Sequence, residues 1–211
     1  MKNDLSDLYR LKRRDTKKAV ETLISSFDSD PLINHMFPSE ESKQNELLHY
    51  YRFMISYGLA FGEIYATSPK IEGLAVWYLS DKYKMNFFKQ MRAGGLRLFI
   101  KLSKETTKRI WPMADFSNGI HHKHGNFKHW YLSPIGVDPE FQGKGYGGLL
   151  IRSMLSRIDK EKLPCCLETQ NPINVKIYKR FDFEVVAEEK IPDSELPHYV
   201  MVRQPKIMQS D

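Results

Sequence analysis

A glycine-rich segment in the second half of the chain, residues 142–148 (QGKGYGG), has the residue types that hold an anion. It follows a strand-like apolar run that ends in Asp138-Pro139, and it leads into a run rich in Leu, Ile and Met that predicts a helix. Glycines let a ligand approach the backbone closely, and the N–H groups at a helix start carry partial positive charge. The segment therefore predicts a site for a phosphate-bearing ligand.

Two other nucleotide-binding loops have similar spacing. Gly143, Gly145 and Gly148 match the G-x-G-x-x-G spacing of dinucleotide-binding domains, and Glu168 ends the next strand, where such domains place a ribose-binding carboxylate. Only one short helix and two strands follow Glu168, which is too little for that fold, so an NAD-type oxidoreductase is kept as the second interpretation. A P-loop is excluded because Gly145, not Ser or Thr, follows Lys144.

Two blocks of the sequence resemble the GNAT superfamily of acyl-CoA-dependent N-acyltransferases. Residues 142–147 are similar to its Q/R-x-x-G-x-G/A signature, and residues 171–183 (NPINVKIYKRFDF) resemble its Asn-x-x-x-Tyr helix and the turn after it. The resemblance covers residues 129–203 well and comes nearest to puromycin N-acetyltransferase-like proteins. Asp182 stands where the family usually has Gly, at a turn that needs a positive φ, which Asp tolerates better than most residues.

The resemblance implies an α/β (α+β) fold: a mixed, mostly antiparallel central sheet with helices on both faces and a helical insertion before the central strand. It implies acetyl-CoA as the co-substrate. The pyrophosphate is expected on the backbone N–H groups of Gln142, Gly143, Lys144, Gly145, Tyr146 and Gly147, with Arg152 adding charge. The pantetheine arm is expected to pair with Ile135 and Val137, where the central strand separates from the strand of Leu167, and to contact Asn174.

The implied reaction is direct attack by a neutral primary amine of a small molecule on the thioester carbonyl, which the N–H of Val137 would polarise. By the motif, Tyr178 is the general acid for the leaving thiolate; without the motif it would be a core aromatic. Glu168 is our candidate for the general base, and a structural role for its carboxylate is equally consistent. A non-catalytic acyl-CoA-binding module is a further alternative.

The apolar patterns predict the elements that position these residues. Pro134 and Gly136 interrupt the long central strand, which predicts a bulge there. The predicted strands are 8–12, 63–68, 71–79, 129–137, 165–169, 183–189 and 198–203, and the predicted helices begin near residues 15, 38, 146 and 171.

Residues 80–128 form the predicted insertion. Its first half is aromatic and basic, and Gly94-Gly95 divides it into two expected helices. A basic amphipathic helix can lie on a membrane, but we prefer helices that pack on the domain and wall a pocket. Residues 104–128 are expected to be less regular, with the histidines of residues 121–124 in a solvated loop. Lys123 within this cluster, and the lack of a carboxylate partner, argue against a metal site.

Composition bounds the rest. The chain has 211 residues, 41% of them hydrophobic and 27% charged, which predicts one globular domain over residues 1–211. The net charge of +6 is spread along the chain, so we expect no nucleic-acid partner. The sequence has no long uncharged apolar run, so we expect no transmembrane helix and no membrane partner, while a homodimer is left open. Adjacent Cys165 and Cys166 predict buried thiols on opposite faces of a strand. The N-terminus shows no apolar leader, and unpaired buried thiols are typical of a reducing compartment, so we expect a cytoplasmic protein. Adjacent cysteines do not have the spacing of a metal site, so we expect no bound metal.

Overall fold

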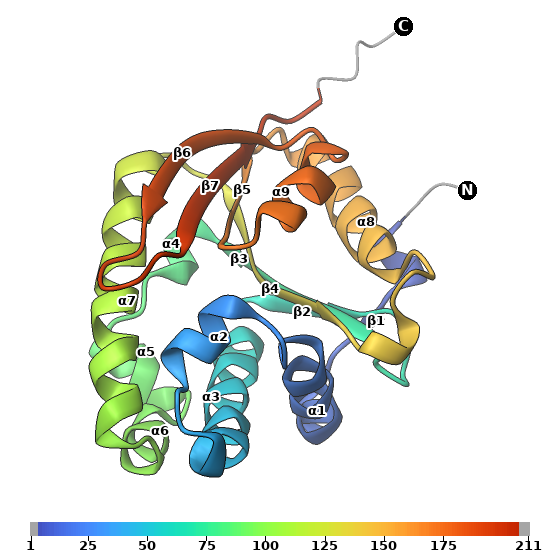
Figure 1. Ribbon diagram of the computed structural model, residues 1–211. Helices are drawn as coiled ribbons and strands as arrows, with labels where there is room; N and C mark the ends of the chain where they lie inside the picture. The colour runs from blue at the N-terminus through green and yellow to red at the C-terminus, as the bar shows by residue number, and fades with distance from the viewer. Residues whose placement is uncertain (1–3, 207–211) are drawn as a thin grey trace, which may run out of the picture.

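The computed structural model describes residues 4–206. In this range seven strands form one sheet in the order β1-β2-β3-β4-β5-β7-β6 (Figure 1). The β4–β5 pair is parallel and every other pair of neighbours in the described sheet is antiparallel. The strands are β1 (Tyr9–Arg10), β2 (Glu63–Ala66), β3 (Gly73–Leu79), β4 (Trp130–Val137), β5 (Cys165–Thr169), β6 (Glu184–Lys190) and β7 (Pro197–Arg203). The expected mixed, mostly antiparallel sheet is confirmed.

Helices cover both faces of the sheet (Figure 1). The helices are α1 (Thr16–Ser26), α2 (Pro31–Met36), α3 (Glu40–Phe61), α4 (Ser80–Tyr83), α5 (Phe87–Arg92), α6 (Gly95–Lys101), α7 (Lys104–His124), α8 (Tyr146–Glu161) and α9 (Pro172–Lys179), with short 3-10 turns at Leu5–Asp7, Arg13–Asp15 and Pro139–Phe141. Two apolar clusters lie on the two faces of the sheet. One cluster packs one face against α1, α2 and α3, and the other packs the opposite face against α8 and α9. Cys166 belongs to the first cluster and Cys165 to the second, so both are buried on opposite faces, as predicted.

The central strand β4 contains the predicted bulge. Ala75 of β3 pairs with Ile135 and Trp77 pairs with Leu132, so β4 has one more residue than β3 in this interval. β4 pairs with β5 only from Trp130 to Leu132, and the remaining residues of β4 do not pair with β5. Figure 1 shows the two strands diverging beyond this point. The separation opens a gap in the sheet at the C-terminal ends of the two strands.

The insertion differs from the sequence prediction in its second half. Residues 104–128 were expected to be irregular, but Lys104–His124 form the 21-residue helix α7, which runs through Pro112. Two contacts at the start of α7 explain its stability: Ser103 caps it, and the buried carboxylate of Glu46 accepts hydrogen bonds from Ser103 N (2.7 Å) and Thr106 Oγ1 (2.6 Å). The expectation of a solvated histidine loop is wrong as well, because residues 121–124 are the last turn of α7.

Other local predictions meet the structure with smaller differences. The division at Gly94 is confirmed, since α5 ends before it, α6 begins after it, and its φ is +94°. Asp182 has the positive φ that was predicted, at +65°. The helix α2 was not expected; it begins at Pro31, with the side chain of Asp30 accepting hydrogen bonds from Leu32 N and Ile33 N.

Candidate functional site

The glycine segment forms a turn that exposes the start of α8. Gly143 and Gly145 have φ values of +76° and +83°, and no protein atom of the described chain lies within 4 Å of a Cβ built on either. The first backbone bond of α8 runs from Leu149 N to Gly145 O, so the N–H groups of residues 146–148 have no intrahelical acceptor. Within residues 4–206 no side chain caps this end. These donors and the helix dipole suit a phosphate group.

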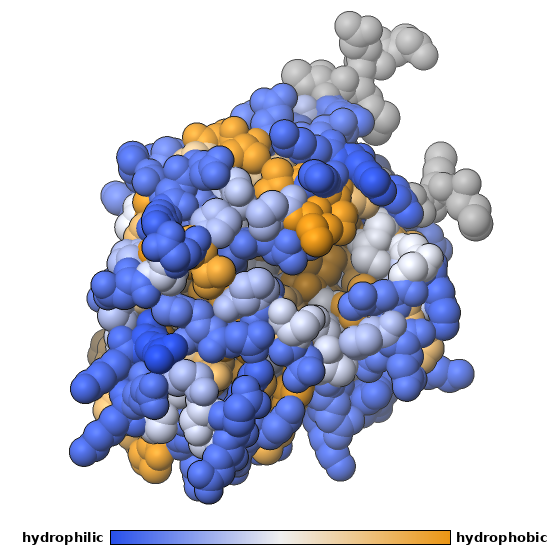
Figure 2. Space-filling view, in the orientation of Figure 1, coloured by the Kyte–Doolittle hydropathy of each residue, from blue (hydrophilic) through white to orange (hydrophobic). Residues whose placement is uncertain are grey.

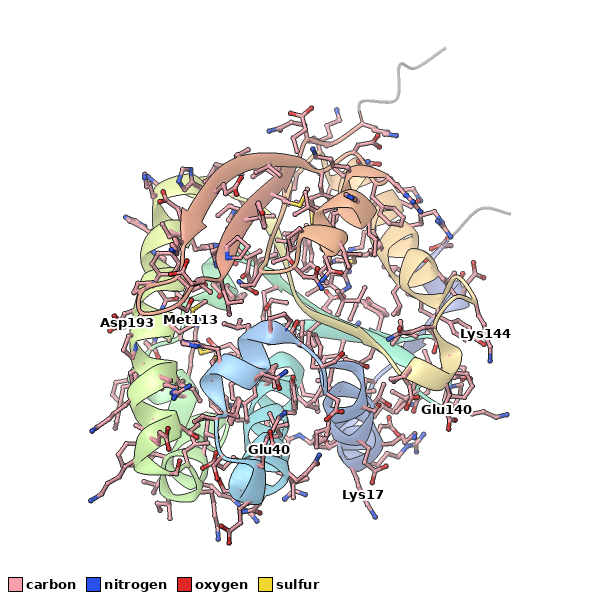
Figure 3. The ribbon with its side chains drawn as sticks, in the orientation of Figure 1. Lys17, Glu40, Met113, Glu140, Lys144 and Asp193 are labelled. Atoms are coloured by element: carbon pink, nitrogen blue, oxygen red, sulfur yellow. The ribbon has the colours of Figure 1, made fainter. Side chains whose placement is uncertain are left out.

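Two cationic side chains lie beside this turn. A Cβ on Gly148 would lie 2.9 Å from Nη1 of Arg152, so the guanidinium covers the first turn of α8. Lys144 donates from Nζ to Glu140 O (3.1 Å) and lies over the ring of Phe141. Figure 3 shows Lys144 and Glu140 on the loop that follows β4, at the edge of the molecule. The positive charge therefore adds to the field of the helix end.

Gln142 does not offer the free backbone donor that was expected. Its N–H donates to Pro139 O at 3.3 Å, and its side-chain Nε2 donates to Val137 O at 3.0 Å. The side chain therefore fixes the end of β4 to the turn. Within residues 4–206, no backbone hydrogen bond is recorded from the N–H groups of residues 143–145.

The separated part of β4 presents backbone groups to the gap. Asp138 N donates to Glu72 O, next to β3, so the N–H groups of Val137 and Ile135 point the other way, into the gap beside β5. A strand edge of this kind pairs with an extended, amide-bearing chain. Figure 2 shows the surface hollowed beneath α9, with apolar side chains on its floor, close to where β4 and β5 separate in Figure 1.

Helix α9 carries the second predicted block. Tyr178 is buried, packs edge-on against Phe183 at a centroid distance of 6.0 Å, and belongs to the cluster that contains Leu167. Burial raises the pKa of Tyr178, so the phenol keeps its proton at neutral pH. Asn174 donates from Nδ2 to Thr169 Oγ1 at 3.4 Å, which ties α9 to the end of β5. Both side chains therefore lie at the β5 side of the gap.

Glu168 lies at the centre of a polar cluster on the other face of β5. Ser117 Oγ donates to Oε2 at 2.6 Å, and Nδ1 of His121 lies 3.2 Å from Oε1. Nε2 of the buried His198 lies 3.2 Å from Oε2, and Nδ1 of that ring faces Gln170 Nε2 at 2.8 Å. Burial opposes the charged carboxylate, but the contacts with His121, His198 and Ser117 outweigh it and lower the pKa of Glu168 to about 2.

Sequence reasoning missed the partners of Glu168. Ser117 and His121 are four residues apart, so they share one face of α7, and that spacing was the available signal. His198 comes from β7, and nothing local in the sequence links it to Glu168. Because side chains alternate along β5, Glu168 faces α7 whereas Leu167 faces Tyr178. The two predicted catalytic residues thus lie on opposite faces of the sheet.

His121 borders an open cavity of about 730 Å³ between the insertion and the start of β4. The cavity is also lined by Tyr83, Asn118 and Phe127. The rings of Tyr83 and Tyr131 lie 4.9 and 4.7 Å from the imidazole of His121, and burial raises the pKa of both phenols. Among residues 4–206, no group of three or more His, Cys, Asp and Glu side chains is arranged to hold a metal ion.

Comparison with known proteins identifies the fold. Residues 110–185 match the model of a family described as an acetyltransferase (GNAT) domain. An uncharacterized N-acetyltransferase of Schizosaccharomyces pombe is 28% identical over 206 residues, which cover 93% of this chain and 83% of that protein. This fungal relative and the domain match both point to an acyltransferase enzyme.

Solved structures agree on the architecture. A histone acetyltransferase HPA2-related protein of Corynebacterium glutamicum is similar with a TM-score of 0.65 and 18% identity, over 96% of this chain and 98% of that one. A polyamine N-acetyltransferase of Drosophila melanogaster is similar with a TM-score of 0.59 and 11% identity, over 93% and 98% of the two chains. At these identities the likeness shows the fold alone, and that fold is the GNAT fold.

Proposed function

We propose that the chain transfers an acetyl group from acetyl-CoA to a primary amine of a small molecule. The observation that carries this proposal is the gap between β4 and β5, which leads directly to the uncapped start of α8. An extended amide-bearing arm that ends in a pyrophosphate fits such a gap and helix end. The nearer likeness to puromycin N-acetyltransferase-like proteins, the cytoplasmic location and the independence from metal stay predictions.

Acetyl-CoA supplies an activated acetyl group on a thioester. The N–H groups of Ile135 and Val137 would pair with the pantetheine arm along the separated part of β4. The thioester would lie nearer the start of the gap, level with Glu168, because Val137 is about 13 Å further along the strand. The N–H groups of residues 143–147 and the guanidinium of Arg152 would hold the pyrophosphate. Gln142 supports this arrangement by its side chain, and Asn174 by fixing α9 to β5.

The amine must lose a proton, and we assign this step to His121, held in place by Glu168. A carboxylate whose pKa is about 2 is a weak base for an ammonium group, so Glu168 is better suited to orient a histidine. His198 is fully buried, with Nε2 3.2 Å from Glu168 Oε2 and Nδ1 2.8 Å from Gln170 Nε2, whereas His121 is partly exposed and borders the cavity. With Nδ1–H donated to Glu168, Nε2 of His121 carries the lone pair that accepts the proton.

The leaving thiolate needs a proton, and we assign this donor to Tyr178. Its burial favours the neutral phenol, so it donates a hydrogen bond to the charge that develops on sulfur and passes its proton to the leaving thiolate. The tyrosine then regains a proton from solvent, because its raised pKa disfavours the phenolate. Tyr178 and His121 lie on opposite faces of the sheet. In this arrangement the amine approaches from the α7 face, and the thiolate leaves towards α9.

A small-molecule acceptor is supported by the cavity beside His121, whose volume of about 730 Å³ lies within the range of small-ligand pockets. The test is thiol release from acetyl-CoA with a panel of aryl-alkylamines, polyamines and amino acid amides. We expect release that depends on the amine and yields the acetylated product. CoA binding by calorimetry without release for any amine would favour a binding module. Binding of NAD but not of CoA would favour the oxidoreductase alternative.

A further inference from the structure

The first half of the insertion has an unusual charge composition. Residues 82–101 hold six Lys or Arg residues and no Asp or Glu. The segment spans the end of α4 together with α5 and α6. We call its outward side the basic apolar patch. The patch comprises the basic residues Lys82, Arg92, Arg97 and Lys101 and the apolar residues Phe87, Phe88, Met91, Leu96, Phe99 and Ile100, while Lys84 and Met85 line the cavity beside His121.

The apolar side chains of this patch face the solvent. Phe88 is 81% exposed, Phe87 is 71% exposed and Ile100 is 68% exposed, and the other apolar members are exposed as well. The two phenylalanine rings lie edge to face, 5.9 Å apart. The expectation that the apolar residues of the insertion pack on the domain is therefore wrong for this side. An exposed apolar surface of this extent marks an interaction site.

The opposite side of the same helices is fixed to the domain. Ala93 is buried, and Leu98 and Leu102 pack against the core cluster around α3. Lys89 turns inward, where its Nζ donates to Lys82 O and Lys84 O. The patch is thus a built surface, with one side docked and the other presented outward. Orange atoms among blue side chains mark part of it at the lower left of Figure 2, where α6 lies in Figure 1.

We propose that the basic apolar patch binds the surface of an anionic lipid bilayer. Exposed aromatic and aliphatic side chains enter the region between headgroups and acyl chains, while surrounding Lys and Arg side chains attract anionic headgroups. A second copy of this chain is a poor occupant because two patches of the same charge repel each other. None of the helices described within residues 4–206 is long and apolar enough to cross a bilayer, so the contact is peripheral. This replaces the expectation of no membrane partner.

The test is flotation of the full chain with vesicles of phosphatidylcholine alone or with 30% phosphatidylserine. We expect binding to the anionic vesicles only, and a decrease of at least about tenfold in the partition coefficient between 50 and 500 mM salt, because screening weakens the attraction. Phe88→Trp in a Trp111→Phe background adds a depth reading. The buried Trp77 and Trp130 remain, so the difference in emission from Trp111→Phe alone reports on position 88. This difference should shift to the blue and be quenched by brominated lipid on binding.

Matched variants separate the patch from general surface charge. Phe87→Ser with Phe88→Ser, and separately Arg97→Glu with Lys101→Glu, should each lower the partition coefficient by about tenfold or more. The controls are Val186→Ser, an exposed apolar residue on β6, and Lys17→Glu with Lys18→Glu on α1, which should leave it within about twofold. All changed side chains are exposed, so unchanged thermal melts are expected.

Four results would overturn the proposal. The first is no flotation with anionic vesicles at 50 mM salt. The second is binding that the α1 charge reversals weaken as much as the patch variants do. The third is sedimentation velocity that shows the wild type as a dimer and the Phe87→Ser, Phe88→Ser variant as a monomer, which would make the patch an interface between copies. Capture of an acidic protein without vesicle binding would likewise assign the patch to a protein partner.

Discussion

Nδ1 of His121 lies 3.2 Å from Oε1 of Glu168, so the last turn of the insertion reaches a carboxylate in the middle of the central sheet. Ser117, one turn earlier on the same helix, donates to the other oxygen of that carboxylate. The insertion is therefore part of the candidate active site. It contributes His121, a side chain that both contacts the carboxylate and borders a cavity.

His121→Asn should lower kcat by about 10²- to 10⁴-fold, because the side chain proposed to take the amine proton is lost. KM for acetyl-CoA should change little, since His121 lies on the face away from α9. Steady-state thiol release at saturating amine measures both constants. Lys123→Gln is the control because that neighbour on α7 is exposed and does not line the cavity. Equal activity of the two variants would exclude His121 as the base.

Tyr178→Phe should lower kcat by about 100-fold while the affinity for acetyl-CoA stays within about twofold, because only the proton donor is removed. Calorimetric binding of CoA and turnover with the best amine are measured in parallel. Tyr199→Phe on β7 controls for loss of a hydroxyl elsewhere. Unchanged turnover in the Tyr178 variant would show that the leaving thiolate takes its proton from water and not from Tyr178.

Gly145→Ala should weaken CoA binding more than tenfold, because the added Cβ occupies the open space in front of α8 and the φ of +83° strains any L-residue by roughly 1–2 kcal/mol. Gly119→Ala, inside α7 with nothing within 4 Å of its Cβ, is the control. That change should stabilise the fold by about 0.5–1 kcal/mol and leave CoA binding intact. Calorimetry and thermal melts give both readings.

Glu168→Gln should destabilise the fold at pH 7 by a few kcal/mol, the free energy that corresponds to a pKa lowered from 4.5 to about 2. Because the folded-state pKa lies below the unfolded value, this stabilisation is complete above pH 4.5 and is lost as pH falls towards 2. Urea unfolding at pH 7 and pH 3 should therefore show a difference from wild type that shrinks in acid. The exposed Glu184→Gln should show no such trend.

Glu46→Ala should destabilise the fold by about 2–4 kcal/mol, because it leaves Ser103 N and the Thr106 hydroxyl without their buried acceptor. Hydrogen exchange should accelerate first at the start of α7. Glu41→Gln, exposed on the same helix, should have little effect. If exchange rose equally throughout the domain, Glu46 would be a general core residue and not the specific anchor of α7.

The sequence predicted correctly the features that depend on the backbone conformation of single residues. Pro134 and Gly136 marked the bulge in β4, the glycines marked the turn before α8, and Asp182 was placed at a positive φ. These features depend on backbone conformation, which single residue types report well. The candidate site residues on β4, α8 and α9 came instead from the resemblance to the GNAT signature, and their roles stay predictions.

Long-range contacts decided what the sequence did not reveal. Helix α7 has few apolar residues and an internal Pro112, so its pattern was typical of irregular chain. Its stability comes from Glu46 at one end and the Glu168 cluster at the other, both more than 40 residues distant in sequence. The same distance concealed His198. The outward patch was misjudged because composition cannot tell which face of a short helix docks.

The double anchoring of α7 constrains how this part of the chain can change in length. Ser103 and Thr106 meet Glu46 at the start, and Ser117 and His121 meet Glu168 near the end. Each residue added between them would turn the later pair by about 100° and move it by about 1.5 Å. One helix length therefore satisfies both carboxylates. In the evolution of this chain, insertions and deletions should accumulate around α5 and α6, and α7 should keep its residue count.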